Sequence, residues 1–431
     1  MVIHMKKLNH ITVFSVASIL VLGFITYIMF SNILTPNIEN HEGQVVYGEI
    51  EMDADYVERE NNKEDAKEEN SEQEIDINND TEQQIELIEA DKDMEEQIKG
   101  KEDEEQLEEI ELFFYEGKIT NIFFHPLIAF PELAFDGDSM HQQMDNWFVT
   151  VTEFNRILDS LYKNNYILID IRDTYEIRHE EGKEIMVKKE LFLPENKKPL
   201  LLSIDDLNYY TYMKNNGTVH KLILDSEGNI ATKTHFPGEE KMISYDNEII
   251  PILESFIAKN PDFSHNGARG VIALTGFNGV LGYDTHKITA PEYQEEKQQA
   301  IEAINYLKEM GWTFSSHGYY HYDTARVEFN KLLNDTKRWE KEVSVLTGPT
   351  EFYIYPFGAT VRPGSDRFKH LIDAGFRAFW GVGPNSQFQI NHNYLLMDRI
   401  NLDGVYFTRN RGKTTQLFDV DSIIDDARGW D

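Results

Sequence analysis

The sequence predicts an α/β domain folded as a distorted (β/α) barrel of about seven parallel strands. It also predicts an N-terminal transmembrane helix and a disordered acidic linker in front of that domain. Two observations favour the barrel. From residue 111 onward, short apolar runs alternate with amphipathic helical segments over short connections, and polar side chains follow the ends of several of the runs. Such strand ends are where barrel enzymes place their chemistry.

The N-terminal segment, residues 11–30, contains 20 residues without a charge, which is enough to cross a bilayer as a helix. Lys6 and Lys7 precede it and no further lysine or arginine occurs before Arg59, so residues 1–10 are predicted to stay in the cytoplasm. A cleaved signal peptide, which would leave the protein secreted, is the alternative, but no convincing small-x-small site follows the run. We expect a single-pass protein of the cell membrane with its folded domain outside the cell. The absence of cysteine in an exported chain favours a bacterial surface.

The net charge of −35 is concentrated before the folded domain. Residues 41–110 hold 28 acidic against 6 basic residues, a local net charge of −22. They have few aromatic residues and no apolar period, so residues 31–110 are predicted to form a disordered linker. A like-charged linker repels itself and extends, which makes it a spacer between membrane and cell wall. No calcium-binding loop sequence occurs in it, and so acidic a chain excludes nucleic acid as a partner.

The predicted domain covers residues 111–408, with a tail at 409–431. The first strand, 121–125, is apolar and ends at His125 and Pro126. A helix capped by Thr152 follows, with apolar residues at the i, i+3, i+4 and i+7 positions, and two asparagines end it at 164–165. The later strands are predicted at residues 166–171, 200–204, 270–275, 312–316, 352–354, 376–382 and 394–400. The later helices are predicted at residues 248–259, 291–310, 327–346 and 366–374.

One insertion and one alternative topology complete the prediction. Residues 221–224 and 230–232 flank a turn and predict a hairpin after the strand at 200–204, which either shapes a pocket rim or is decoration. A doubly wound open sheet is the alternative fold. It is disfavoured because no Gly-x-Gly-x-x-Gly follows the first strand.

The chemistry-bearing residues gather at predicted strand ends. Asp205 and Asp206 end the run at 200–204, and His317 and His321 follow the run at 312–316. A divalent metal with three protein ligands is a hydrolytic centre, and a further carboxylate beside it is a ready general base. The alternative is that the carboxylates cap a turn and the histidines are solvated. A third motif, residues 355–358, also closes an apolar run and favours the hydrolytic interpretation.

These motifs resemble those of the NodB-homology polysaccharide deacetylases, carbohydrate esterase family four, and the resemblance covers residues 120–404. Ser-Ile-Asp-Asp at 203–206 resembles the family's Thr-Phe-Asp-Asp motif. Ser-His-Gly-Tyr-Tyr-His at 316–321 resembles its Ser-His-x-x-x-His motif, and Tyr-Pro-Phe-Gly at 355–358 resembles its Pro-Tyr-Gly loop.

The resemblance implies a role for each matching residue. Asp205 would be the catalytic base, and the backbone amide of Phe357 would stabilise the oxyanion. The metal ligands would be Asp206, His317 and His321. The implied metal is Zn²⁺, with Co²⁺, Ni²⁺ or Mn²⁺ as alternatives. The implied sugar-contacting residues, for which packing is the alternative role, are Tyr319, Tyr320 and Trp380.

Two departures from the family pattern concern the base and the acid. Ile354 stands where the family often has an arginine that positions the base, and Arg399 is predicted to hold either the substrate or the base. No histidine matches the family's Leu-x-His near residue 397. The general acid is therefore left open among Asp398, His125 and His392. His125 lies in a segment similar to the opening of exported members, where a histidine lies near the active centre, or it simply ends its strand.

The implied function is a metal-dependent hydrolase acting on amide bonds. It would remove N-acetyl groups from a cell-surface or cell-wall polysaccharide, such as peptidoglycan or an N-acetylglucosamine polymer, and release acetate. The alternatives are an O-acetyl polysaccharide esterase, a non-catalytic polysaccharide-binding relative, and a structural surface protein whose motifs are coincidental. The sequence does not predict the oligomeric state.

Overall fold

The computed structural model describes residues 111–430 except residues 237, 239 and 385. The predicted transmembrane segment, residues 11–30, and the acidic linker, residues 31–110, lie outside the described residues and stay predictions. Among the residues that the structure describes, no helix combines the length and the apolar composition that a membrane span requires.

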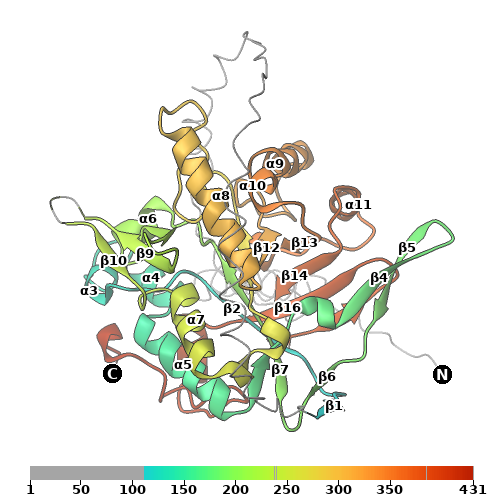
Figure 1. The fold of residues 1–431 in the computed structure, drawn as a ribbon, viewed down its shortest axis with the longest axis horizontal. Helices are drawn as coiled ribbons and strands as arrows, with labels where there is room; N and C mark the ends of the chain where they lie inside the picture. Colours follow the sequence, from blue (N-terminus) through green and yellow to red (C-terminus); the bar gives the residue numbers. More distant parts are fainter. Residues whose placement is uncertain (1–110, 237, 239, 385, 431) are drawn as a thin grey trace, which may run out of the picture. The chain divides into compact units, whose positions relative to one another are not determined.

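Seven parallel strands close into a barrel (Figure 1). Each strand pairs with the next one along the chain, and the last pairs back with the first. The strands are β2 (Thr120–Phe124), β7 (Lys198–Asp205), β11 (Val271–Leu274), β12 (Thr313–Ser316), β13 (Phe352–Ile354), β14 (Ala378–Val382) and β16 (Leu395–Asn401). The prediction of about seven parallel strands is confirmed, and the pairing of β16 with β2 excludes the open sheet.

The predicted strand at 166–171 is a short strand beside the ring. β3 (Tyr166–Leu168) pairs with the first residues of β7, from Lys198 to Leu200, whereas β11 pairs with Ser203 to Asp205 on the same edge. β3 ends early because the side chain of Asp170 caps a 3₁₀ turn, Ile171–Asp173, that takes the chain out of the sheet.

The helices pack on the outside of the barrel (Figure 1). They are α3 (Pro131–Ala134), α4 (His141–Trp147), α5 (Val151–Lys163), α6 (Thr211–Asn215), α7 (Ile249–Lys259), α8 (Tyr293–Glu309), α9 (Phe329–Glu342), α10 (Ser344–Thr347), α11 (Asp366–Asp373) and α12 (Gly404–Asn410). The cap of α5 is Thr150 and not Thr152, because Thr150 and Glu153 form a reciprocal capping box.

Period-two alternation decides which strand residues enter the barrel. Ile122, Phe124 and Leu202 point outward and join the core beneath α5 and α7. The alternate residues fill the interior, which is apolar through most of its length, as Leu201 and Trp380 show. At the carboxyl ends of the strands the interior becomes polar.

The insertions are hairpins. The predicted hairpin is confirmed as β8 (Lys221–Leu224) and β9 (Ile230–Thr234), and β10 (Met242–Ser244) adds a third strand. The charged segment after β3 contains a hairpin that the sequence did not reveal, β4 (Tyr175–Glu180) and β5 (Lys183–Lys188). The remaining short strands are β1 (Leu112–Phe114), β6 (Phe192–Pro194) and β15 (Phe388–Ile390).

The C-terminal segment, residues 411–430, packs on the domain. Leu417, Phe418, Val420 and Ile423 are buried in the same core as α5, and the side chain of Arg156 on α5 donates to the carbonyl of Ile424. The predicted domain boundary at residue 408 falls inside α12. Residues 411–430 therefore complete the core instead of trailing from it.

Gly404 allows α12 to approach α4 closely, because a Cβ atom there would lie 1.8 Å from the carbonyl oxygen of Asp145 and 3.0 Å from Nη1 of Arg428. We expect Gly404→Ala to destabilise the domain by about 3 kcal/mol through overpacking. Thermal unfolding of residues 111–431 measures this. The control is Gly412→Ala, which has open space around it and a φ of 68°, and should cost only about 1 kcal/mol. Equal losses from the two variants would contradict the prediction.

Candidate active site

Asp205, Asp206, His317 and His321 meet at the carboxyl ends of β7 and β12. Asp205 ends β7, where it pairs in register with Ala273, and His317 directly follows β12. Ligand atoms of Asp206, His317 and His321 all lie within 4.8 Å of one another. Nε2 of His317 is 3.9 Å from Asp206 Oδ1, and Nε2 of His321 is 3.6 Å from Asp206 Oδ2. The structure thus brings together the groups whose spacing predicted a metal site.

The loop after β7 turns Asp206 toward the histidines. Asp206 has a left-handed backbone with a φ of 59°, which Asp tolerates better than most residues. Its backbone N–H donates to the carbonyl of Ala273 at 3.2 Å, and its Oδ1 accepts a hydrogen bond from the Tyr210 hydroxyl at 2.6 Å. Burial raises the pKa of Asp206 above its usual value, while nearby histidine charge and the Tyr210 bond oppose that rise.

The loop between His317 and His321 is held by Asp335 of α9. The Asp335 carboxylate accepts the backbone N–H groups of Tyr319, at 2.9 Å, and of Tyr320, at 2.7 Å. Burial raises the pKa of Asp335 to about 6, although both N–H groups favour its charged form. Sequence reasoning missed Asp335, because nothing in a polar helix residue indicates which loop it will contact.

The three candidate ligands fit a divalent cation. The Nδ1–H of His317 donates to the carbonyl of Ile354 at 2.8 Å, which leaves Nε2 as the lone-pair nitrogen on the side of the aspartates. Nδ1 of His321 is buried without a hydrogen-bond partner among the described residues. Burial lowers the pKa of His317 to about 4 and that of His321 to about 3. Both imidazoles are therefore neutral at pH 7, as metal ligation requires.

Arg399 holds Asp205 inside the barrel. Nη1 and Nη2 of Arg399 donate to the two carboxylate oxygens of Asp205 at 2.6 and 2.9 Å, and Nη1 also donates to Ser203 Oγ at 3.0 Å. Burial alone would raise the pKa of Asp205, but Arg399 and His317 bring it below the usual value. Arg399 is 0% exposed, so its geometry favours the predicted role at the base over contact with a substrate.

Position 354, where the resemblance led us to look for an arginine, is an isoleucine, and Arg399 is the arginine that bonds to Asp205. Ile354 lies inside the barrel and is fully buried, and its backbone carbonyl serves His317. The guanidinium that bonds to Asp205 comes instead from Arg399 on β16, two strands away from β7 in the ring.

Of the three acid candidates, His125 faces the cluster. It follows β2, whose Phe124 pairs with Ile204, so His125 comes opposite Asp205. Its Nδ1–H donates to the carbonyl of Trp147 at 3.1 Å. A positive charge on the His125 imidazole would lower the pKa of both Asp205 and Asp206.

The other two acid candidates point elsewhere. Asp398 is on the opposite face of β16 from Arg399, and its carboxylate lies against Gly381 and Gly383. Burial raises its pKa. His392 is exposed and precedes β16, at the end of the barrel opposite to the aspartates.

Phe357, the predicted oxyanion donor, packs against His321. Phe357 has a left-handed backbone with a φ of 58°, and its N–H donates no hydrogen bond to any group among the described residues. Its ring packs edge-on against His321 with 4.5 Å between the centroids. The Phe357 ring therefore contacts a candidate metal ligand.

The three predicted sugar-contacting residues differ in exposure. Tyr319 is 1% exposed, and its hydroxyl donates to Glu342 at 2.5 Å. Trp380 is 0% exposed inside the barrel. Tyr320 is half-buried, with its hydroxyl bonded to Arg338. These positions favour packing roles for Tyr319 and Trp380 and leave Tyr320 able to meet a ligand.

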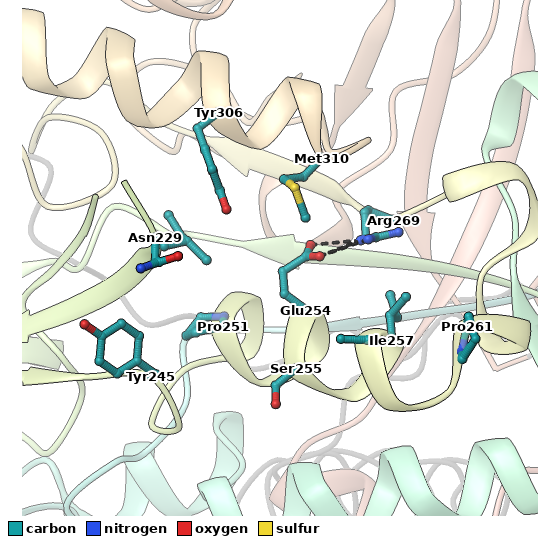
Figure 2. Close-up of a pocket in the computed structure, with 12 residues that line it drawn as sticks. Asn229, Tyr245, Pro251, Glu254, Ser255, Ile257, Pro261, Arg269, Tyr306 and Met310 are labelled. Atoms are coloured by element: carbon teal, nitrogen blue, oxygen red, sulfur yellow. Dashed lines mark hydrogen bonds and ion pairs between the residues drawn. The ribbon is translucent and has the colours of Figure 1, made fainter. Parts of the chain in front are cut away.

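Two cavities lie away from this cluster. One, of about 700 Å³, opens between the β8–β10 insertion, α7 and α8, and is lined by residues including Tyr245, Glu254, Arg269 and Tyr306 (Figure 2). The other, of about 590 Å³, lies near the amino-terminal end of β12. None of the predicted site residues lines either cavity.

No family model matches the sequence, and no curated protein matches it. Two solved structures are similar. The deacetylase PplD of Streptococcus pyogenes, in complex with acetate, has 13% identity, covering 67% of this chain and 93% of that chain, with a TM-score of 0.37. The de-N-acetylase of Aggregatibacter actinomycetemcomitans has 11% identity, covering 71% and 99%, with a TM-score of 0.38. Both of those proteins are named as deacetylases.

We predict that Asp206→Asn weakens zinc binding by at least about 100-fold, because the amide keeps the shape and the left-handed backbone of Asp206 but removes the only anionic ligand of the three. Isothermal titration calorimetry of residues 111–431 measures the affinity. Asp398→Asn is the control and should bind zinc like the unaltered protein. Equal zinc affinity in the two variants would exclude Asp206 as a ligand.

Proposed function

We propose that this protein is a metal-dependent hydrolase that removes N-acetyl groups from a cell-surface or cell-wall polysaccharide and releases acetate. The observation that carries the proposal is the separation of roles between two adjacent aspartates. Asp206 lies with the two neutral histidines as a candidate ligand, whereas Asp205 is kept ionised by Arg399 and lies 3.9 Å from His317. A buried carboxylate kept ionised beside a metal-type site has the properties of a general base.

The candidate ligands would supply the electrophilic part of the reaction. Asp206, His317 and His321 would hold a divalent ion such as Zn²⁺, which would supply polarisation of a carbonyl oxygen and a lowered pKa of water. Asp205 accepts a proton from the attacking water on a lone pair that Arg399 leaves free. The Phe357 N–H donates to the developing oxyanion, a contribution of about 3 kcal/mol.

His125 is the proposed general acid. As the carbon–nitrogen bond of the amide breaks, the imidazolium gives a proton from Nε2 to the departing amine, and acetate is the second product. Its Nδ1–H is committed to the Trp147 carbonyl, which leaves Nε2 as the nitrogen that exchanges protons. The half-buried position of His125 allows a substrate to reach it.

The catalytic interpretation is favoured over a non-catalytic relative. The sequence lacks two residues of the family pattern, the arginine that positions the base and the histidine that acts as the acid. In a degenerate site no other side chain would take their places. The guanidinium of Arg399 beside Asp205, and an imidazole at His125 next to the β2–β7 pairing, support the catalytic interpretation. The proposed location is the outer surface of a bacterial membrane, because the predicted anchor and acidic linker would carry the domain into the wall.

Asp205→Asn should abolish acetate release from N-acetylglucosamine oligomers and peptidoglycan while zinc stays bound, because only the proton acceptor is lost. Released acetate is measured enzymatically and zinc by elemental analysis. An acetylated xylan in the same panel separates N-deacetylation from ester cleavage. Unchanged acetate release by the variant would refute the role of Asp205, and hydrolysis of the xylan alone would assign an esterase.

Arg399→Met should move the acidic limb of the pH–rate profile of kcat/KM to higher pH. Arg399 lowers the pKa of Asp205, so without it the base is protonated, and activity is lost, at a higher pH than in the unaltered protein. Arg399→Lys keeps the charge and should show a smaller displacement. An acidic limb at the same pH in all three proteins would mean that Arg399 does not tune the base.

A further inference from the structure

We propose that Arg428, in the C-terminal segment, is a positioning residue for His125. This inference rests on the proposed function and deepens it: the C-terminal segment sets the orientation of the imidazole that protonates the departing amine. Arg428 is about 300 residues from His125 in the sequence, and the motif resemblance, which ends at residue 404, does not include it.

Arg428 is a fully buried guanidinium with every nitrogen bonded. Its Nε and Nη2 donate to the two carboxylate oxygens of Glu153 at 2.5 and 2.8 Å. Its Nη1 donates to the Asp145 carboxylate at 2.9 Å and to the Asp145 carbonyl at 2.7 Å. Its Nη2 also donates to the Phe148 carbonyl at 2.7 Å. One side chain thus ties the end of α4 to the start of α5.

The segment that Arg428 ties down is the one that holds His125. The carbonyls of Asp145 and Phe148 flank Trp147, whose own carbonyl accepts the Nδ1–H of His125. The Phe148 ring lies beside the imidazole with 5.5 Å between the centroids. The hydrogen bond and the ring contact together fix the tautomer and the direction of Nε2.

The residue type is demanding. Two carbonyls and two carboxylates are reached at once by a planar fork of donors, which lysine does not possess. The space beside the guanidinium is also tightly packed: a Cβ atom added at Gly404 would lie only 3.0 Å from Nη1 of Arg428. A lysine at position 428 would keep the charge but leave one or both backbone carbonyls without a donor.

Two substrates with different leaving groups can distinguish a displaced His125 from a general loss of protein stability. An amide cannot expel its amine without a proton, whereas 4-nitrophenyl acetate expels a phenolate that needs none. Both substrates need Asp205 and the Phe357 amide. A displaced His125 should therefore slow the amide reaction selectively, and a general loss of folding should slow both reactions equally.

The experiment compares kcat of residues 111–431 on an N-acetylglucosamine oligomer and on 4-nitrophenyl acetate. We expect Arg428→Lys and Arg428→Met to lose about 100-fold on the amide, the lower end of what a general acid contributes, and less than about threefold on the ester. The matched control is Arg269→Met. Arg269 is a partly buried arginine that pairs with Glu254 near the amino-terminal end of β11 (Figure 2), and it also donates to backbone carbonyls. Its loss should change both reactions by the same factor.

A double variant tests whether the two residues act through one another. If Arg428 works through His125, adding Arg428→Met to His125→Asn should cost no further amide activity. Losses that multiply, or an amide-to-ester ratio in Arg428→Met equal to that of Arg269→Met, would overturn the proposal.

Nitrogen-15 NMR of the His125 imidazole provides a readout that does not depend on turnover, with the signals assigned by their absence in His125→Asn. At a pH high enough for the imidazole to be neutral, the unaltered protein should show the tautomer protonated at Nδ1, and Arg428→Met should show a mixture of the two tautomers. An unchanged tautomer would overturn the proposal even in a protein that releases no acetate, whereas failure of the proposed function alone would leave this tautomer shift in place.

Discussion

The ion pair between Asp205 and Arg399 is the interaction on which the site depends. A carboxylate in the interior of a small barrel is expensive to ionise, because burial removes it from water. Two hydrogen bonds from a fully buried guanidinium offset that cost and keep the pKa of Asp205 low. The pair also fixes the carboxylate in one orientation. Asp206, one residue later, has no such partner and lies instead with two neutral imidazoles, so adjacent residues of the same type acquire different chemistry.

Much of the fold, and the loops that form the candidate site, could be predicted from the local sequence. Apolar runs, glycines at helix ends and the alternation of strands with helices predicted the barrel, and polar residues at the ends of the runs predicted which loops meet. The capping error at Thr152 was also local: the Thr-x-x-Glu spacing selects Thr150, the residue that the structure uses.

The interactions that sequence reasoning missed are those between distant segments. Asp205 and Arg399 are 194 residues apart and meet only because β16 pairs with β2 and β2 with β7. Arg399 was singled out, but a single sequence cannot decide between the base and the substrate without that register. Asp335 and Arg428 could not be singled out from the sequence, because each is one polar residue whose partners lie in distant segments: backbone N–H groups for Asp335, and backbone carbonyls and two carboxylates for Arg428.

Closure of the barrel brings together the proposed general acid and the proposed general base. His125 follows the first strand of the ring, Arg399 lies on the last, and Asp205 ends the second, so the three come from the adjacent strands β16, β2 and β7. The two groups proposed to move protons therefore lie on the first and second strands of the ring, next to the pairing of the last strand with the first. The C-terminal segment beyond β16 returns to α4 and α5 and supports His125 from behind through Arg428. The candidate metal ligands, from β7 and β12, lie on the other side of Asp205. A substrate amide placed between them would have its carbonyl toward the ligands and its nitrogen toward the closure, which is the polarity that hydrolysis requires.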